Sequence, residues 1–367
     1  MIIFLGIMIV AIAAIIAGVI YILRQMRSYA WMKKLCERNK ALGWIVTLIP
    51  VLIIGFFLYL DVVNTLVVVI HIIIIWLIVD GIRALLKIGH KQIQSFWSAL
   101  ITLAFCICYL GYGYYNDYHV VVTRYHLSTD KKIGENLRIV QISDSHIGAT
   151  FHADGFKKHL KTIAKLHPDV IVITGDYVDD DTSKKDMVES TRALGKLKTK
   201  HGIYYVYGNH DKGLMNYRNF STKDLAKTLK QNHIHILEDE TVSLGKHITI
   251  AGRQDDMTTK NRKSAEALMR RVSKNQYSIL LDHEPTDYEN EQKTNADLVL
   301  SGHTHGGQMF PIGITGELSG ANDMTYGMKK IRNTTFIVNS AISDWAIKFK
   351  TGGAISEIGV IDIKQKS

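Results

Sequence analysis

The chain has 367 residues and a formal net charge of +10, but its composition changes sharply along its length. Residues 1–116 carry 9 Lys and Arg against 3 Asp and Glu, whereas residues 117–367 carry 35 Lys and Arg against 31 Asp and Glu. Residues 117–367 show no basic stripe with interleaved aromatic residues, so we infer no stable nucleic-acid partner. All three cysteines lie in residues 1–116, which excludes thiolate metal ligands, a cysteine nucleophile and disulfides from the rest of the chain.

The first 116 residues are dominated by apolar side chains and predict four membrane-spanning helices. Residues 2–23 form an unbroken apolar run, about 33 Å long as a helix. No basic segment precedes this run and no small-residue cleavage site follows it, so we interpret it as a retained anchor and not as a cleaved signal peptide. Asp61 and Asn64 interrupt the next apolar run, which predicts spans at about 44–60 and 62–79. A fourth span is expected at about 96–113.

The basic residues of this region predict its orientation. They concentrate at 24–42 and 80–95, and the positive-inside rule places both loops in the cytoplasm. The N-terminus and all residues after 116 are then expected outside the cytoplasmic membrane. His71 lies within the third span, where it is either a functional intramembrane group or, as we favour, a neutral histidine bonded within the helical bundle.

Residues 117–367 form a second predicted domain, in which short apolar runs alternate with amphipathic stretches. This alternation, followed by strand-rich sequence, predicts a layered α/β architecture with a mixed pair of sheets. Helices are expected at 154–166, 184–197 and 261–273. Strands are expected at 120–125, 137–142, 170–174, 203–207, 234–237, 241–244, 248–251, 277–281, 297–300, 335–339 and 358–363.

Side chains that can bind metal ions follow five of these predicted strands. Loops at the carboxyl ends of strands converge on one edge of an open sheet, so five separate segments can meet there. Oxygen and imidazole ligands without thiolate suit Mn, Fe or Zn at a non-structural site, and their number exceeds what one ion needs. The segments are Asp144-Ser145-His146, Gly175-Asp176-Tyr177-Val178-Asp179, Gly208-Asn209-His210-Asp211, His283, and Gly302-His303-Thr304-His305.

The ordered series D-x-H, G-D-x-x-D, G-N-H-D, a single H and G-H-x-H resembles the calcineurin-like metallophosphoesterase family over about residues 137–310. The resemblance implies a four-layer αββα sandwich and two divalent metal ions, with a metal-activated hydroxide attacking phosphorus. It implies that Asp144, His146 and His305 hold the first metal, that Asn209, His283 and His303 hold the second, and that Asp176 bridges them.

The same resemblance implies roles for the remaining motif residues. His210 is expected to face the substrate, where it stabilises phosphoryl charge or protonates the leaving oxygen. Asp211 is expected to orient His210 and support its charge. Asp179 is expected to orient a histidine or to brace its loop and not to bind metal.

The sequence Gly-His-Thr-His-Gly-Gly-Gln resembles a bacterial branch of this family that is often tethered to membranes, with relatives similar to UDP-diacylglucosamine hydrolases. This chain departs from that branch near its C-terminus, where Lys348 and Ser356-Glu357-Ile358 stand in place of an Arg and a Pro-Glu-Ile strand. Because of this departure, the resemblance does not extend to the substrate of those relatives. Residues 306–327 are interpreted either as a substrate-facing loop or as a simple connection.

We therefore expect a membrane-anchored hydrolase of phosphomonoesters or phosphodiesters, acting on lipid or envelope substrates. The alternative is a membrane sensor or adaptor that keeps the fold and binds a ligand without significant turnover. The complete ligand set and the presence of His210 favour the enzyme, since a binding module does not need that histidine.

Overall fold

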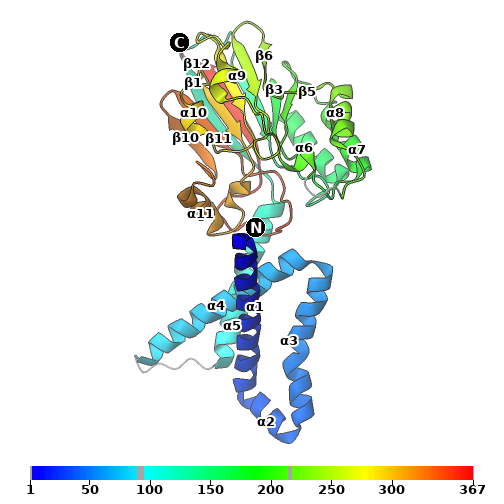
Figure 1. Cartoon of the computed structure of the whole chain (residues 1–367), viewed down its shortest axis with the longest axis vertical. Helices are drawn as coiled ribbons and strands as arrows, with labels where there is room; N and C mark the ends of the chain where they lie inside the picture. The colour runs from blue at the N-terminus through cyan, green and yellow to red at the C-terminus, as the bar shows by residue number, and fades with distance from the viewer. Residues whose placement is uncertain (1, 89–94, 214–216, 367) are drawn as a thin grey trace. The chain divides into compact units, whose positions relative to one another are not determined.

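The computed structural model describes residues 2–88, 95–213 and 217–366, with the backbone alone described for residues 2–12, 87–88 and 95–96. The chain divides into two compact units, Met1–Tyr112 and Gly113–Ser367 (Figure 1). The boundary expected from sequence, after residue 116, lies slightly further along. The difference arises from two backbone hydrogen bonds. Gly113 O accepts from Lys350 N at 2.9 Å, and Asn116 O accepts from Ser356 N at 2.9 Å. Residues from Gly113 on therefore belong to the second unit.

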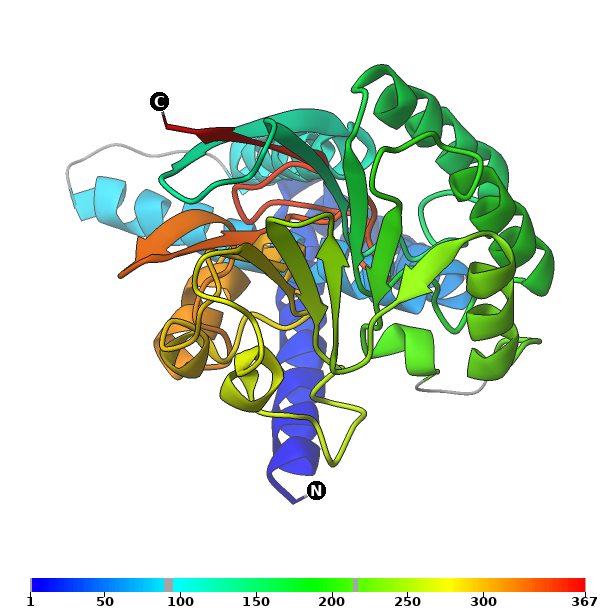
Figure 2. The ribbon, with the colours of Figure 1, turned by 90° about the horizontal axis from the view of Figure 1, so that it is seen from above.

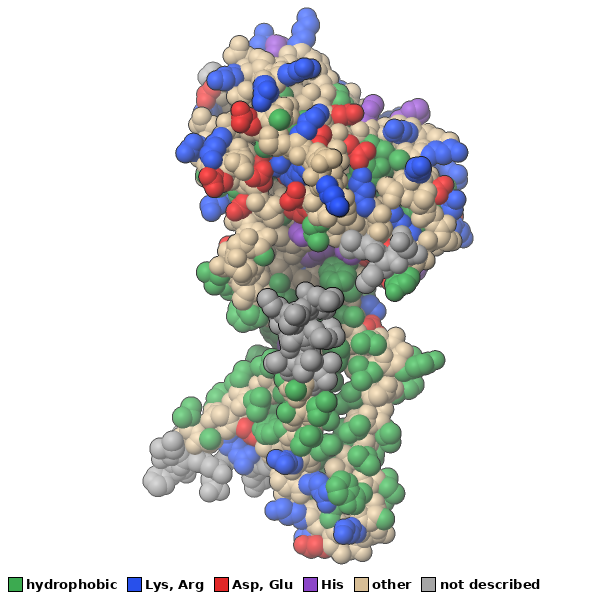
Figure 3. Space-filling model, viewed as in Figure 1, with side chains coloured by type: hydrophobic (Ala, Val, Ile, Leu, Met, Phe, Trp, Pro, Cys, Tyr) green, Lys and Arg blue, Asp and Glu red, His purple; other side chains and the backbone are tan. Residues whose placement is uncertain are grey.

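The first unit is helical, and apolar side chains cover much of its surface (Figure 3). Its helices are α1 (Ile2–Ser28), α2 (Ala30–Arg38), α3 (Lys40–Leu60), α4 (Val62–Ile88) and α5 (Ser95–Tyr118). Among the described residues, three helical stretches are long and apolar enough to cross a membrane: Lys40–Leu60, Val62–Leu86 and Trp97–Tyr118. They contain three of the four predicted spans. The remaining predicted span, at about 2–23, falls in α1, where the side chains up to residue 12 lie outside the described set.

The break between α3 and α4 lies where the polar residues predicted it. Asp61 separates the two helices, and its carboxylate accepts a bond from Asn64 N at 3.0 Å, which satisfies a free amide at the start of α4. Further along α4, His71 Nδ1 donates to Val67 O at 2.8 Å. This bond agrees with the favoured interpretation of His71 as a histidine bonded within the helices.

The second unit is built on two mixed six-stranded sheets. The first has the order β1-β12-β2-β3-β4-β5 and the second the order β10-β11-β9-β8-β7-β6. Within them β2 to β5 run parallel, as do β7, β8, β9 and β11. The strands are β1 (Val121–Thr129), β2 (Leu137–Ile142), β3 (Val170–Thr174), β4 (Ile203–Val206), β5 (Ile234–Ile236), β6 (Glu240–Leu244), β7 (Ile248–Gly252), β8 (Tyr277–Leu281), β9 (Leu298–Ser301), β10 (Gly327–Ile331), β11 (Thr334–Val338) and β12 (Glu357–Gln365).

Both faces of each sheet are covered, and strand periodicity explains how. In β3, Val170 and Val172 belong to the core between the sheets, whereas Ile171 and Ile173 belong to the core under the helices. Helices α6 (Ala153–Lys165), α7 (Lys184–Leu194) and α8 (Thr222–Gln231) cover the outer face of the first sheet, seen in green in Figure 2. The short α9 (Ala265–Met269) and α10 (Tyr288–Glu291) cover the outer face of the second. The fold is therefore an α/β pair of sheets with helices outside.

Candidate metal centre

Five loops at one edge of the two sheets carry the side chains that the sequence analysis selected. The strands before these loops are parallel neighbours, β2 to β4 in one sheet and β8 and β9 in the other, so their carboxyl ends emerge together. The loops hold Asp144 and His146 after β2, Asp176 and Asp179 after β3, Asn209, His210 and Asp211 after β4, His283 after β8, and His303 and His305 after β9.

Three of these side chains form a first buried cluster. Asp144, His146 and His305 each offer one ligand atom, and the three atoms lie within 4.8 Å of one another. His305 Nε2 is 3.6 Å from Asp144 Oδ1. All three residues are at most 4% exposed. The grouping matches the first predicted metal position, where two imidazoles and one carboxylate are a common ligand set for Mn, Fe or Zn.

A second cluster lies beside the first, and its carboxylate approaches a histidine of the first. The ligand atoms of Asp176, His283 and His303 lie within 4.8 Å of one another. Asp176 Oδ2 is 3.2 Å from His283 Nε2 in this cluster and 3.7 Å from His146 Nε2 in the first. One carboxylate oxygen thus lies near a histidine of each cluster, between the two candidate metal positions.

Hydrogen bonds to Nδ1 orient three of the histidines so that Nε2 faces the centre. His146 Nδ1 lies 3.0 Å from Asp179 Oδ2, and His283 Nδ1 donates to Thr174 O at 2.7 Å. His305 Nδ1 donates to Ser343 O at 3.2 Å. Such partners fix the tautomer and the ring orientation of a metal-binding histidine, leaving the lone pair of Nε2 available.

The backbone at these residues adopts a conformation that side chains seldom tolerate. Asp144, His146, Asp176, His303 and His305 have φ angles of 49°, 33°, 50°, 69° and 50°. Each left-handed residue of this kind costs about 1–3 kcal/mol and persists only where the surrounding structure imposes it. Five strained residues at one edge of the sheets indicate a functional site there. This indication comes from the backbone conformation, which the sequence motifs do not reveal.

Glycines beside the centre allow the loops to approach closely, as the sequence analysis expected. A Cβ at Gly208 would overlap Asp176 Oδ1, and one at Gly302 would overlap Ser143 Oγ. At Gly175, where φ is +89°, a Cβ would overlap the His283 ring. A larger residue at any of these positions would push two ligand loops apart.

The donor atoms left without partners fit bound cations. His146 Nε2 and Asn209 Oδ1 are buried and, within the described residues, have no hydrogen-bond partner. A buried polar atom without a partner is costly, and ligation would remove that cost. Asn209 is 4% exposed, which agrees with its predicted place in the second ligand set. The donors are carboxylate, amide and imidazole, which suits Mn, Fe or Zn.

The pKa shifts of His303, His305 and Asp176 favour their ligand forms. Burial, together with the neighbouring His283, lowers the pKa of His303 to about 4, and burial beside His146 holds that of His305 well below its usual value. Both imidazoles are therefore neutral near pH 7. Burial alone would raise the pKa of Asp176, but His283 and His146 hold it below its usual range and keep the carboxylate charged. In contrast, although burial opposes it, neighbouring Asp179 and Asp176 raise the pKa values of His146 and His283, and burial raises that of Asp144.

The carboxylate that contacts His210 is Asp179, and this differs from the expected role of Asp211. His210 Nδ1 lies 3.0 Å from Asp179 Oδ1, while Asp179 Oδ2 holds His146. Asp211 Oδ1 instead accepts bonds from Tyr177 N at 2.9 Å and Val178 N at 3.0 Å, and its Oδ2 accepts one from Gly208 N at 2.9 Å. Asp211 therefore joins the β3 and β4 loops. Asp179 contacts both His146 and His210, as one of its two expected roles, the orientation of a histidine, requires.

One exposed aromatic side chain beside His210 escaped the sequence analysis. The ring centroid of Trp345 lies 5.9 Å from that of His210, and the Trp345 side chain is 46% exposed. Its neighbour Asp344 accepts a bond from Thr150 Oγ1 at 2.7 Å, which anchors the loop. Trp345 belongs to no motif and lies far along the chain from His210, so only the fold brings the two together.

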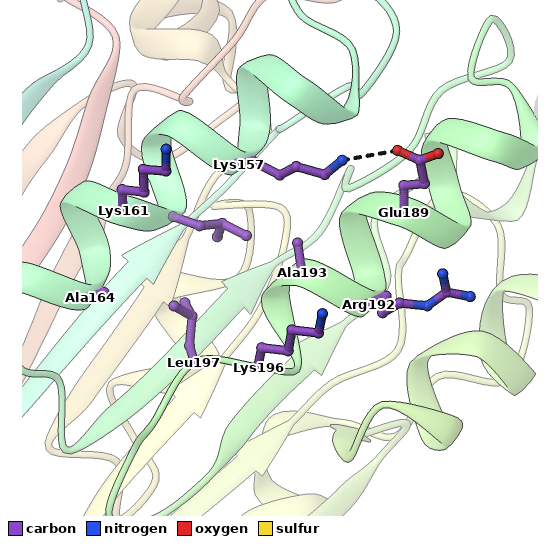
Figure 4. A pocket seen from close by; sticks show the side chains of 9 residues that line it. Lys157, Lys161, Ala164, Glu189, Arg192, Ala193, Lys196 and Leu197 are labelled. Atoms are coloured by element: carbon purple, nitrogen blue, oxygen red, sulfur yellow. Dashed lines mark hydrogen bonds and ion pairs between the residues drawn. The ribbon is translucent and has the colours of Figure 1, made fainter.

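A separate hollow of about 470 Å³ lies between α6 and α7 (Figure 4). It is lined by Lys157, Leu160, Lys161, Ala164, Glu189, Arg192, Ala193, Lys196 and Leu197. Lys157 Nζ and Glu189 Oε2 form an ion pair across it at 2.9 Å. None of the metal-centre residues lines this hollow, so it plays no part in the arrangement described above.

Comparison with known proteins assigns the fold that holds this centre. The sequence profile of the calcineurin-like phosphoesterases matches residues 137–307. The uncharacterized metallophosphoesterase YkuE of Bacillus subtilis is 32% identical over 208 residues, which cover 54% of this chain and 70% of YkuE. This chain belongs to the calcineurin-like phosphoesterase family. The paired clusters resemble a dimetal site.

Other metallophosphoesterases are similar over a comparable range. The uncharacterized metallophosphoesterase Cj0846 of Campylobacter jejuni is 30% identical, covering 63% of this chain and 60% of its own length. A Bos taurus protein named transmembrane protein with metallophosphoesterase domain is 29% identical, covering 59% of this chain and 51% of its own length. The chain thus spans between 51% and 70% of the lengths of these three relatives.

Loading of this centre is expected to stabilise the protein measurably. A ligand at a hundred times its Kd stabilises a fold by about 2.7 kcal/mol, or roughly 5–10 °C for a unit of this size. We expect Mn²⁺ to raise the melting temperature of EDTA-treated full-length protein by that amount, measured by circular dichroism. Asp144→Asn should lose most of the rise. An identical melting curve with and without Mn²⁺ in the native protein would contradict metal binding here.

Proposed function

We propose that this chain is a membrane-anchored, metal-dependent phosphoesterase that hydrolyses phosphomonoester or phosphodiester bonds. The first cation would be held by Asp144, His146, His305 and Asp176, and the second by Asp176, Asn209, His283 and His303. Two divalent cations at these positions would supply Lewis acidity and lower the pKa of a bound water. The observation that carries the proposal is the contact of one Asp176 oxygen with a histidine of each cluster.

His210 is the residue of this chain that we assign to the substrate. Its ring is partly exposed, in contrast to the buried ligand His146. Burial disfavours its charged form, but the hydrogen bond that His210 donates to Asp179 and the charges of Asp176 and Asp179 raise the pKa of His210 to about 9. It is then an imidazolium near pH 7, able to offer a proton to a leaving oxygen or to stabilise phosphoryl charge.

We further propose that the catalytic unit works at the outer face of the cytoplasmic membrane. The three apolar helices support an anchor, and the basic residues between the predicted spans support this orientation. Anchoring raises the effective concentration of the centre toward phosphate esters of lipids or of the cell envelope. Protease added to intact cells should then degrade the catalytic unit, and protection until the cells are opened would reverse the orientation.

The activity itself is tested with the full-length protein in detergent. We expect Mn²⁺-dependent release of nitrophenolate from bis(p-nitrophenyl) phosphate, abolished by EDTA and restored by Mn²⁺. Turnover no faster than that of free Mn²⁺, combined with retained metal binding, would favour the sensor or adaptor alternative. A panel of phospholipids, nucleotides and nucleotide sugars would then define the ester that is cleaved.

Trp345 is expected to influence which leaving group is accepted. Because its exposed ring lies beside His210, a flat leaving group can stack on it, and such contacts contribute about 1–3 kcal/mol per aromatic group. We expect Trp345→Ala to raise KM for bis(p-nitrophenyl) phosphate about 10-fold with little change in kcat, and Trp345→Phe to retain most of the affinity. Equal kinetic constants for Trp345→Ala and the native protein would remove Trp345 from the substrate site.

A further inference from the structure

The segment after the last histidine motif presents an unusual row of exposed apolar side chains. Phe310, Ile312, Ile314 and Leu318 are 59%, 52%, 56% and 82% exposed. Helix α11 (Ile312–Ser319) buries none of its side chains, and Glu317 is the one charged residue between 306 and 322. Exposed apolar residues are ordinary when scattered singly, but a contiguous patch marks an interaction surface.

This surface is held in place and is not a loose loop. Thr325 fixes it at two points, since Thr325 Oγ1 donates to Gly313 O at 2.9 Å and Thr325 N donates to Glu317 Oε1 at 2.7 Å. Before the helix, Met309 is buried and accepts a bond from Ile312 N at 2.7 Å through its carbonyl. The apolar side chains therefore point outward from a defined backbone. Figure 3 shows hydrophobic side chains over α11, whereas charged side chains are spread over the rest of the visible surface of this unit.

Short contacts connect the segment to the end of helix α5. Thr351 N donates to Gln308 O at 2.7 Å, and Phe310 N donates to Thr351 Oγ1 at 3.3 Å. On its other side Thr351 lies against α5, because a Cβ at Gly113 would come within 2.5 Å of Thr351 Cγ2. Phe310 and the last turns of α5 are thus separated by a single residue.

The end of α5 has the composition of a membrane interface. Helix α5 is apolar enough to cross a membrane over Trp97–Tyr118, and Tyr114, Tyr115 and Tyr118 are 47%, 53% and 37% exposed in its last turns. Tyrosine is enriched at the level of the lipid headgroups. Two residues separate α5 from β1, and the last turns of α5, from Gly113 on, belong to the same compact unit as the metal centre.

We propose that Phe310 and the outward side chains of α11 insert into the bilayer interface beside the point where α5 leaves the membrane. The occupant is the lipid bilayer, because the patch holds a single charged residue, Glu317, whose carboxylate is bonded to Thr325 N, and because it is tethered next to the tyrosines of a spanning helix. The inference rests on the proposed function only for the crossing of the membrane by α5.

The docking defines the substrate class of the metal centre more closely. His305 and Phe310 are separated by Gly306, Gly307, Gln308 and Met309, so the centre and the inserted segment share one edge of the unit. A centre at this edge lies at the depth of lipid headgroups. Phosphate esters carried on the membrane surface are then its substrates, in preference to esters free in solution.

The test uses the full-length chain with Cys36, Cys106 and Cys108 replaced by serine. A single cysteine is introduced by Leu318→Cys, labelled with the polarity-sensitive fluorophore NBD and reconstituted in phosphatidylcholine vesicles. Lys246→Cys is the matched control, because this exposed residue lies at the amino end of β7, on the opposite edge from the metal centre. Ile314→Cys provides a second position in the segment if the label at 318 disturbs folding, as judged by thermal melting.

We expect the probe at 318 to emit at shorter wavelength and to be quenched by lipids with a doxyl group on the acyl chain, while the probe at 246 is quenched by aqueous iodide. Iodide quenching at both 318 and 314 equal to that at 246 would overturn the docking. Shielding from both quenchers would also overturn it and would indicate a second copy as the occupant. Quenching does not depend on turnover, so the two proposals can fail separately. An active enzyme with a solvent-exposed segment would refute only the membrane docking. An inactive protein with an inserted segment would refute only the proposed phosphoesterase activity.

Discussion

Replacement of Asp176 by asparagine is expected to reduce Mn²⁺-dependent hydrolysis by at least about 10³-fold, because metal-assisted catalysis supplies several kcal/mol of stabilisation to the reaction. The substitution would keep the shape of the side chain and remove its charge. The native Asp176 Oδ2 contacts His146 and His283, one from each ligand cluster, so one substitution affects both metal positions. The rate of bis(p-nitrophenyl) phosphate cleavage and the metal content by mass spectrometry of the purified protein measure the effect.

The control for Asp176→Asn is the same chemical change on the surface. Asp154 in α6 has a 90% exposed side chain and pairs with Lys157. Asp154→Asn should keep full activity and two metal equivalents, while Asp176→Asn should retain at most one. Undiminished activity in Asp176→Asn, or equal loss in both variants, would contradict the bridging position of Asp176.

The strands that place the centre are the elements that the sequence predicted best. The predicted bounds of β2, β3 and β8 match the structure because each is a short, predominantly apolar run that ends at a polar loop. Strand β10 (Gly327–Ile331) was not predicted, since its two lysines and exposed edge resemble a loop. Helix α8 (Thr222–Gln231) was missed for a similar reason, because it buries only Leu225 and Leu229 among charged neighbours.

Other features depend on tertiary structure that no local pattern encodes. The stretch 306–327 was left between two interpretations, and it contains helix α11, whose lack of a buried face removes the periodicity by which helices are recognised. Trp345 acquires its position from the loop that follows β11, far along the chain from every motif. The positive φ angles of five predicted ligands likewise correspond to no local sequence pattern.

The assignment of Asp211 illustrates the limit of reasoning from neighbouring residues. His210 and Asp211 begin a 3₁₀ turn, His210–Lys212, in which successive side chains point about 120° apart. The two adjacent side chains therefore point in different directions, and the bonds of the Asp211 carboxylate go to backbone amides and not to His210. Asp179, which lies on another loop, reaches His210, while Asp211 points inward to backbone amides. The motif identified the correct loops, but the pairing required their arrangement in space.

Asp179→Asn is expected to lower kcat about 10–100-fold, the usual effect of removing a carboxylate that orients a metal ligand or a catalytic imidazole. Its two oxygens hold Nδ1 of His146 and of His210, so both the first metal and the proton donor lose their orientation. The pH dependence gives a more specific test. The proposed active form carries protonated His210, so the rate falls as pH rises through the pKa of His210.

That pKa is raised to about 9 although burial opposes it, and the hydrogen bond that His210 donates to Asp179 is the largest raising cause. Loss of the negative charge in Asp179→Asn lowers the pKa of His210, so the alkaline fall in kcat moves to lower pH. Asp211→Asn is the contrasting variant. It leaves a buried backbone amide without its acceptor, at a cost of about 1–3 kcal/mol in the free energy of unfolding, and shifts the alkaline fall less. Profiles of kcat against pH and thermal melts of both variants decide between them. A large shift in Asp211→Asn with none in Asp179→Asn would return the orienting role to Asp211, because only the carboxylate bonded to His210 can set both its position and its charge.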